Sequence, residues 1–282
     1  MQSVKQIRVH VSDMEQAIQV ERQGALPVFS LENTALSVPS RISLADLPES
    51  FPFAVLMNSP IPQSQLDHAE QLVRDIWTNG AQWLYFSDPA VLRFCSQEER
   101  KKCIYRPEML ATSIADGQFW LDQGIGEVSV SPLLTREETV QILHALPHAE
   151  LTIHGHVLLS VSRRRLLSAW KEQYGADLEP MHNPHLTLRE TTRQECMPVY
   201  ESEAGTMIFS DYVLESFDYM NDFRDAEAMY IEGAFLTAEA IVQAVSLYQR
   251  LLSGESAEAE IQAYRTAVPD SSRGYYDQKT IL

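Results

Sequence analysis

The chain has 282 residues, of which 45% are hydrophobic and 22% charged, so it has enough apolar material for a large core and is not a disordered acidic protein. It carries 22 lysine and arginine residues against 39 aspartate and glutamate residues, a net charge of −17. This charge repels phosphate backbones and anionic lipid, so tight binding of nucleic acid by this chain alone is disfavoured.

Eight short, mostly apolar segments indicate β-strands, with helical or loop segments between them. The expected strands are Ile7–Val11, Leu26–Ser30, Phe53–Met57, Trp83–Ser87, Cys103–Arg106, Glu127–Ser131, Glu150–His154 and Ala228–Glu232. Eight strands that alternate with helices predict an α/β fold, namely a (β/α)8 TIM-like barrel.

Three of the expected helices begin with a hydroxyl side chain three residues before a carboxylate, which is the spacing of a capping box. These helices follow the first, third and sixth expected strands. The pairs are Ser12 with Glu15, Ser64 with Asp67, and Thr135 with Glu138.

The connection between the seventh and eighth expected strands is unusually long, about residues 156–227. It holds an expected helix near Ser162–Tyr174 and an expected hairpin that turns at Gly205. Insertions at the carboxyl face of a barrel commonly build its working site. We predict one barrel domain over residues 1–254, which includes this insertion, followed by a linker and tail over residues 255–282.

Cysteine usage and hydropathy bear on the cellular location. No apolar run approaches the ~18 residues that a membrane span needs, and the first residues show no apolar stretch typical of a secretion signal. Three cysteines are too few and too scattered for a disulfide framework. We therefore expect a cytoplasmic protein with reduced thiols and no membrane contact.

Several motifs from about residue 100 onwards resemble the U-32 (collagenase-like) peptidase family. In that family a strand ends in His-Gly and is followed by a cysteine, a Ser-Gly pair, a second cysteine and Leu-Leu-Ser. Its later motifs are a Gly-Thr hairpin, a strand ending in Ile-Glu-Gly and an Asn-Arg-Gly-Phe segment. The similar segments here, in the same order, are Leu151–Gly155, Ser160–Ser162, Leu166–Ser168, Gly205–Thr206, Ile231–Gly233 and Ser272–Tyr275.

The chain departs from this family at the cysteines, which hold an iron–sulfur cluster in characterised members. Their positions fall here at Leu158 and Arg165, and a further pair expected near Asn183–His185 is missing. Cluster ligation takes about four thiolates. We therefore predict a short form of the family with no cofactor and, in particular, no iron–sulfur cluster.

His154 and Glu232 end the seventh and eighth expected strands, where barrel enzymes place catalytic groups. His154 can orient a substrate or relay a proton, and it can equally be a histidine that shapes the turn before Gly155. Glu232 is either a catalytic carboxylate or a buried one that accepts hydrogen bonds from backbone amides. Both residues match the family motifs, so we take them as the candidate catalytic pair.

Four histidines raise the question of a metal. His154 and His156 are two residues apart on an expected strand and so face the same way, and His182 and His185 follow in the insertion. Such spacing often occurs without a metal, and two of these residues lie on an expected loop. We predict no metal site.

Arg163, Arg164 and Arg165 form the densest basic run in an acidic chain. Guanidinium groups bind phosphates and acidic partner surfaces, so we interpret this run as a site for an anion or a partner. The alternative is a solvated helix face.

Family members of known role act in oxygen-independent hydroxylation of tRNA uridine, ribosomal RNA cytidine or ubiquinone precursors, some of them as pairs of related barrels. The resemblance implies an accessory subunit that forms a heterodimer with a longer, cluster-bearing paralogue, with tRNA uridine modification as the favoured pathway, and that contacts tRNA only indirectly. Two alternatives stay open: a cluster-free hydrolase or peptidase-like enzyme using His154 and Glu232, and a small-ligand-binding barrel without catalysis. No His-Glu-x-x-His or Gly-x-Ser-x-Gly protease motif is present, so whether the chain is an enzyme is left open.

Overall fold

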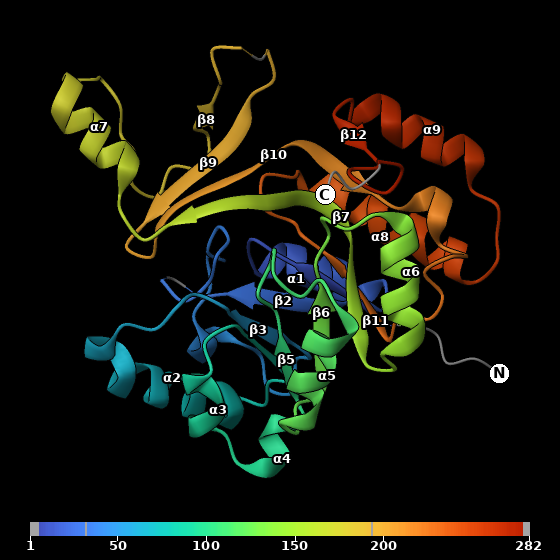
Figure 1. Ribbon diagram of the computed structural model, residues 1–282, viewed down its shortest axis with the longest axis horizontal. Helices are drawn as coiled ribbons and strands as arrows, with labels where there is room; N and C mark the ends of the chain where they lie inside the picture. The colour runs from blue at the N-terminus through green and yellow to red at the C-terminus, as the bar shows by residue number, and fades with distance from the viewer. Residues whose placement is uncertain (1–5, 32, 193, 279–282) are drawn as a thin grey trace.

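A computed structural model describes residues 6–31, 33–192 and 194–278 and shows a closed barrel of parallel strands (Figure 1). The barrel strands are β1 (Gln6–His10), β2 (Leu26–Ser30), β3 (Ala54–Met57), β4 (Trp83–Phe86), β5 (Cys103–Tyr105), β6 (Glu127–Val130), β7 (Ala149–Ser162) and β11 (Ala228–Ile231). Each strand pairs in parallel with the next, and β11 pairs with both β7 and β1, which closes the circle. The predicted TIM-like barrel is confirmed, with all eight strands close to their expected places.

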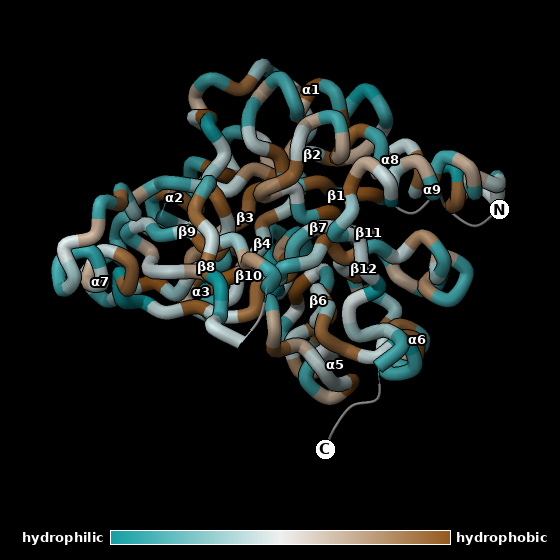
Figure 2. The backbone as a smooth tube through the Cα atoms, turned by 90° about the horizontal axis from the view of Figure 1, so that it is seen from above, coloured by the Kyte–Doolittle hydropathy of each residue, from teal (hydrophilic) through white to brown (hydrophobic). Residues whose placement is uncertain are grey.

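Helices surround the barrel and share one large apolar core with the outer faces of the strands. Figure 2 shows hydrophobic residues gathered along the central strands. The helices here are α1 (Met14–Arg22), α2 (Leu66–Thr78), α3 (Ala90–Phe94), α4 (Gln97–Arg100), α5 (Ile114–Asp122), α6 (Arg136–Ala145) and α8 (Ala238–Leu252), with the 3-10 turns η1 (Leu44–Asp46), η2 (Gln63–Gln65) and η3 (Phe217–Tyr219). Within the described ranges, no helix is both long and apolar enough to cross a membrane.

Of the three capping boxes that the sequence predicts, the one at Thr135 and Glu138 forms. Helix α1 is capped instead by Asp13, whose side chain accepts a hydrogen bond from the backbone N–H of Gln16. Helix α2 has no side-chain cap, because the 3-10 turn η2 precedes it directly. A neighbouring carboxylate and a preceding turn thus replaced the two hydroxyl caps that we expected.

The long insertion forms an arm that projects from the barrel (Figure 1). Strand β7 runs beyond the barrel to Ser162 and pairs with β10 (Gly205–Glu215), which in turn pairs with β9 (Met197–Ser202) and through it with β8 (Thr187–Leu188). Helix α7 (Leu166–Tyr174) lies at the far end of this ribbon. The expected hairpin forms at Gly205, whose φ of 124° and closeness to the Ser162 carbonyl leave no room for a side chain.

Residues 255–278, which we expected to be a linker and tail, fold back on the barrel. Helix α9 (Glu258–Ala267) packs against α8, and strand β12 (Ser271–Ser272) pairs with β10. Ile261 and Tyr264 lie three residues apart on one face of α9 and are both buried. This segment therefore contributes side chains to the core.

The barrel interior holds a buried cluster of charges centred on Arg8, which is 2% exposed. Its guanidinium lies 2.6 and 2.8 Å from the two carboxylate oxygens of Glu127 and 2.9 Å from Oε2 of Glu150. Tyr85 donates a hydrogen bond of 2.6 Å to the same oxygen of Glu150. Burial opposes the charge on Arg8, but Tyr85 and the two carboxylates outweigh it and raise the pKa of the guanidinium.

Arg106 forms a second charged layer nearer the carboxyl ends of the strands. It donates to the hydroxyls of Ser129 and Thr152, both at 3.1 Å, and to Glu108 at 2.9 Å. Its guanidinium lies 3.8 Å from the centre of the Tyr230 ring, a cation–π contact. Paired charges and aromatic rings therefore fill this part of the barrel axis.

Replacing Arg8 by methionine is expected to lower the free energy of unfolding by about 3–5 kcal/mol, because two buried carboxylates lose their counter-ion. Urea unfolding measures the change. The matched control is Arg74→Met, which removes a solvent-exposed ion pair with Glu70 and is expected to cost less than about 1 kcal/mol. Equal losses in the two variants would contradict a stabilising role for the buried pairing.

Candidate functional site at the carboxyl face of the barrel

His154, one member of the predicted catalytic pair, points away from the barrel interior into the core beneath the C-terminal helices. Its Nδ1 lies 3.2 Å from the hydroxyl of Tyr248 and its Nε2 lies 2.8 Å from the hydroxyl of Tyr264. Burial, with a further contribution from His156, lowers the pKa of this imidazole to about 3. His154 is therefore neutral near pH 7 and engaged at both nitrogens, as is typical of a structural histidine.

Glu232, the other member of the pair, points into the barrel interior. Its Oε1 lies 2.7 Å from Nδ1 of His10 and accepts hydrogen bonds from the hydroxyl of Ser37 at 3.1 Å and the backbone N–H of Ala234 at 3.0 Å. Burial acts to raise the pKa of Glu232, but His10, Arg106 and the Ala234 amide outweigh it and hold the pKa at about 2. This carboxylate is therefore ionised at neutral pH.

The structure does not bring the side chains of His154 and Glu232 together. Their strands are neighbours, and the backbone N–H of Glu232 donates to the carbonyl of His154 at 2.9 Å. However, β7 has a bulge here, because Tyr230 pairs with Thr152 whereas the next residue of β11 pairs with His154. Since one extra residue reverses the side to which later side chains point, Thr152 faces the interior and His154 faces the outer core.

His10 is the partner of Glu232, and our sequence reasoning missed it. It is 2% exposed at the end of β1, with Nε2 2.8 Å from the hydroxyl oxygen of Ser30 on β2. The contact of Nδ1 with Glu232 is short but lacks good hydrogen-bond angles. The available signal was the alternation of Arg8 and His10 with valines, since polar residues at i and i+2 share one face of a strand.

A cavity of about 740 Å³ opens above His10 at the carboxyl ends of β1, β2 and β11. Its volume is typical of small-molecule sites, and this end of a TIM barrel is the usual place for one. The insertion supplies one wall and the connection from β2 to β3 supplies another. The lining residues are His10, Ser12, residues 38–42, His182, Pro184, His185, Tyr200 and residues 233–236.

Two residues that line this cavity have left-handed backbones that are uncommon outside glycine. His182 has a φ of 55° and Phe235 a φ of 66°. The ring of Phe235 is held by edge contacts with Phe209 and His156, at 5.0 and 5.9 Å between centroids. Such strained positions are concentrated at functional sites in other proteins, which favours this cavity as the candidate site.

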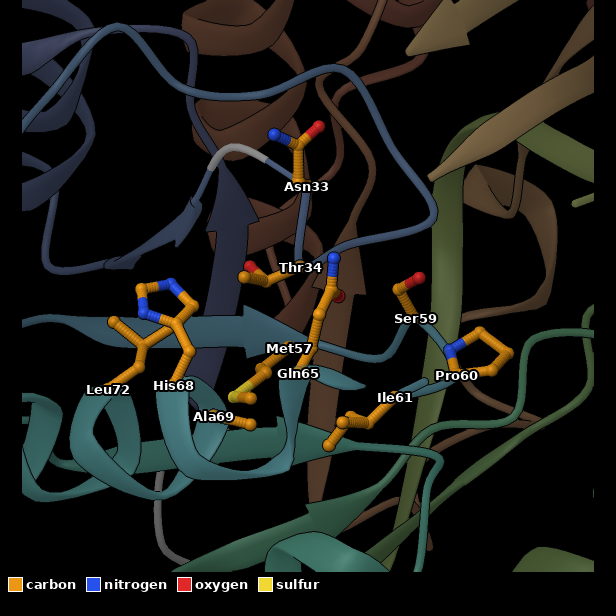
Figure 3. A pocket seen from close by; sticks show the side chains of 10 residues that line it. All are labelled: Asn33, Thr34, Met57, Ser59, Pro60, Ile61, Gln65, His68, Ala69 and Leu72. Carbon is orange, nitrogen blue, oxygen red and sulfur yellow. The ribbon is translucent and has the colours of Figure 1, made fainter. Parts of the chain in front are cut away.

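Figure 3 shows a second cavity, between the start of α2 and the loop that follows β2. Its volume is about 150 Å³, and its lining includes Thr34, Met57, Gln65 and His68. Ligand sites are commonly about 300 Å³ or larger. We therefore place the candidate functional site at the larger cavity.

The two positions at which the related family carries cysteines differ in their surroundings. Leu158 is 4% exposed and packs in an apolar cluster with Leu36, Tyr200, Met207 and Phe209. The other position, 165, is an exposed arginine at the start of α7.

The cysteines of the chain lie elsewhere. Cys95 and Cys103 are buried, and their sulfurs are 3.9 Å apart beside α4, whereas Cys196 is exposed on the arm. Across the described part of the chain, no group of three or more histidine, cysteine, aspartate or glutamate side chains is arranged to hold a metal ion.

Glu201 on β9 holds the arm helix in place. Its buried carboxylate accepts hydrogen bonds from the backbone N–H groups of Leu167 and Ser168, at 2.8 and 2.9 Å, and from the hydroxyl of Thr206 at 2.7 Å. A carboxylate at a helix N-terminus satisfies free N–H groups and complements the helix dipole. The Leu-Leu-Ser and Gly-Thr motifs thus meet at one carboxylate.

Arg163, Arg164 and Arg165 are all exposed where β7 turns into α7. The guanidinium of Arg163 donates to the carbonyl of Pro60 at 3.2 Å, which ties the turn between β7 and α7 to the loop that follows β3. The three arginines of the predicted anion or partner site therefore lie on the arm and are not among the residues that line the cavity above His10.

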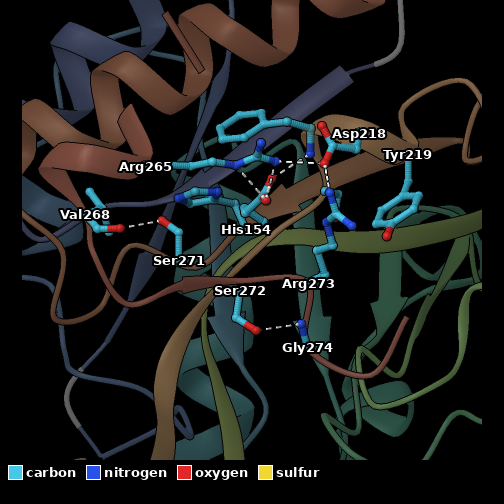
Figure 4. Close-up of polar contacts among 12 residues, drawn as sticks. His154, Asp218, Tyr219, Arg265, Val268, Ser271, Ser272, Arg273 and Gly274 are labelled. Atoms are coloured by element: carbon cyan, nitrogen blue, oxygen red, sulfur yellow. Dashed lines mark hydrogen bonds and ion pairs between the residues drawn. The ribbon is translucent and has the colours of Figure 1, made fainter. Parts of the chain in front are cut away.

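The Ser272–Tyr275 motif, through Arg273, joins a network of ion pairs next to His154 (Figure 4). Arg273 lies 2.6 Å from Asp218, and Arg265 on α9 lies 2.9 Å from Asp218 and 2.6 Å from Glu215. These ion pairs join the C-terminal segment to the end of β10 and to η3. His154 and the late motif therefore belong to one structural unit that fixes α9 against the barrel.

The His154→Gln variant is expected to unfold with a weaker dependence on pH in the acid range. The pKa of His154 is about 3 in the folded chain and 6.5 in a free imidazole, so the unfolded chain binds the extra proton first. The stability from this neutral group is complete above pH 6.5 and is lost as the pH falls towards 3. Between about pH 7 and about pH 4.5, the wild type should lose about 2 kcal/mol more than the variant.

Urea unfolding at the two pH values measures this difference, since the other titrating groups are common to both proteins. His144→Gln, at an exposed histidine of α6, is the control for removal of an imidazole outside the core. A His154→Gln variant with the pH dependence of the wild type would show that the imidazole is not held neutral.

Comparison with known proteins supports the family resemblance that the sequence motifs indicate. The model of Peptidase family U32 matches residues 50–279, a range that contains all the motifs from Leu151 to Tyr275. A solved structure described as that of the U32 peptidase Mk0906 has 11% sequence identity and a TM-score of 0.49, over 82% of this chain and 94% of that chain. No curated protein matches the chain. Because the family match spans well over half of the sequence, the chain belongs to peptidase family U32.

Proposed function

We propose that this chain is a cytoplasmic, cluster-free accessory subunit that forms a heterodimer with a longer, cluster-bearing paralogue in the oxygen-independent hydroxylation of tRNA uridine. The observation that carries the proposal is the arm helix α7, which has no buried residue. A helix of nine residues is marginally stable alone in water. Its exposed apolar side chains therefore favour packing against another protein.

The surroundings of Leu158 support the cluster-free part of the proposal. A cluster needs about four thiolates around an open space, and here an apolar core of five side chains fills the corresponding region. At the second position, Arg165 places a cation where a thiolate would be needed. The residues present do not fit an iron–sulfur cluster, so the redox chemistry is assigned to the paralogue.

The composition of the arm surface supports a protein partner. Leu166, Trp170 and Tyr174 are 45%, 50% and 65% exposed, and their spacing of four residues places them on one face of α7. Tryptophan, tyrosine and arginine are the residues most enriched at the energetic centres of protein interfaces. The adjacent run of three arginines favours a partner with an apolar groove flanked by carboxylates.

Mass spectrometry of nucleosides from bulk tRNA tests the pathway. Cells that lack this gene are expected to lose nucleosides derived from hydroxyuridine, and the wild-type gene should restore them. The double variant Trp170→Ser with Tyr174→Ser should fail to restore them and should bind the paralogue at least about tenfold more weakly in anaerobic co-purification, because its apolar anchors are lost.

Phe119→Ser is the matched control, since Phe119 on α5 is an aromatic side chain of similar exposure, 57%, away from the arm. It should restore the nucleosides and retain the paralogue. A nucleoside profile that stays unchanged after deletion of both this gene and its longer paralogues would rule out the pathway. Purification of the chain as a monomer with no related protein would rule out the partner.

His10 and Glu232 favour a second candidate function, a cluster-free hydrolase or peptidase-like enzyme. An ionised carboxylate 2.7 Å from an imidazole, at the base of a cavity on the catalytic face of a barrel, is an arrangement that general bases use. The hydroxyl of Ser30 donates to the carbonyl of Val38 at 2.7 Å, so in this structure it is not positioned as a nucleophile. The general base would therefore remove a proton from a water molecule, and that water would attack the substrate.

Assays of the purified chain against a mixed peptide library test this second function. If hydrolysis occurs, Glu232→Gln should lower kcat by about a hundredfold or more, as loss of a positioned acid–base group does. His154→Gln should retain activity while the chain stays folded, because its imidazole lies outside the cavity. Activity that survives Glu232→Gln, or no hydrolysis at all, would eliminate this candidate.

A further inference from the structure

The cavity above His10 differs in charge from the rest of the molecule. The chain has 39 acidic and 22 basic residues, yet none of the side chains that line this cavity is an aspartate or a glutamate. Four of them can carry positive charge: His10, Arg41, His182 and His185. A lining that excludes acids on an acidic protein favours a ligand with negative charge.

Three of these basic groups pair with carboxylates that are not among the lining residues, and one of them is His10, whose Nδ1 lies 2.7 Å from Oε1 of Glu232. Asp13 is 2.8 Å from Arg41, and Glu203 is 3.2 Å from His182, and both pairs are at the surface. Surface pairs contribute little because water and salt screen them. A ligand anion can therefore compete for these cations. The imidazole of His185 has no hydrogen bond or ion pair with any described residue.

Apart from Ser12 and Ser40, most of the remaining lining is apolar or aromatic. Val38, Ile42, Phe235 and Leu236 contribute aliphatic and aromatic surface, and Tyr200 contributes a ring from β9. An inorganic anion would leave this surface in contact with water, whereas an organic anion would cover it. The volume of about 740 Å³ also exceeds what an inorganic anion needs.

We propose that this cavity binds a small organic anion, namely a carboxylate or phosphate ester with an apolar or aromatic body. The anionic group lies against Arg41, His182 and His185 at the rim, and the body lies over the apolar lining towards His10. The accessory role proposed above plays no part in this inference, which stands or fails with the cavity alone.

Isothermal titration of the full chain with benzoate, phenyl phosphate and benzamide tests the proposal. Benzamide is a neutral analogue of benzoate, so a difference between the two isolates the charge. At least one anion is expected to bind at a single site at least about tenfold more tightly than benzamide, the effect of one charge-assisted hydrogen bond. The comparison of benzoate with phenyl phosphate distinguishes a carboxylate site from a phosphate site.

Variants locate the site. Arg41→Gln with His185→Gln should weaken binding of the preferred anion about tenfold, whereas Arg163→Gln, a cation on the arm, should leave it unchanged. Asp13→Asn should tighten binding, because it frees Arg41 from its ion pair while asparagine still caps α1. This gain cannot result from misfolding.

Three results would overturn the proposal. The first is binding of benzamide as tight as that of both benzoate and phenyl phosphate, and the second is the absence of binding by either anion. The third is binding that stays unchanged both in the double variant and in Asp13→Asn, since that would place the anion outside this cavity.

Discussion

The pairing of Arg8 with Glu127 and Glu150 inside the barrel is the interaction on which the remaining structure depends. Closure of the sheet at β11 brings these side chains onto the barrel axis, where water cannot solvate them. A buried guanidinium with two carboxylates is tolerable only when each charge has its partners. The strands that carry them are therefore fixed in register, and the lower part of the barrel is filled.

Because that space is filled, the accessible part of the interior lies near the carboxyl ends of the strands. Arg106 forms the next layer, and its charge helps to keep Glu232 ionised beside His10. The cavity opens directly above this pair. The position of the candidate site thus follows from the charges beneath it.

Much of the fold was predictable from the sequence for a simple physical reason. Parallel strands are buried on both faces, so they stand out as short apolar segments between polar helices, and all eight were recognised. The C-terminal segment was harder, because its large buried side chains, Ile261, Tyr264 and Tyr276, are few and an acidic stretch precedes them. Its contribution to the core depends on tertiary contacts that local patterns do not reveal.

The site was predictable only in part, and His154 shows why. Glu150 and Thr152 face the barrel interior, so strict alternation predicts that His154 does so as well. A single bulge reverses this, and no residue type near it announces the bulge except Gly155, which fits against the backbone of Glu232. Glu232 was identified at a functional position, but its partner comes from β1, more than two hundred residues earlier in the chain.

The arm and the cavity differ in the chemistry of their surfaces, so they suit two different kinds of binding partner. The arm presents apolar and aromatic side chains beside arginines at the end of a ribbon, where a large surface can approach without meeting the acidic barrel. The cavity is bordered by residues of the same insertion and is lined in part by imidazoles, and its volume of about 740 Å³ suits a small molecule. Tyr200 belongs both to the cavity lining and to the apolar cluster around Leu158. A partner that shifts the arm would therefore also move one wall of the cavity, and by linkage a ligand in the cavity would alter the affinity for the partner by the same factor.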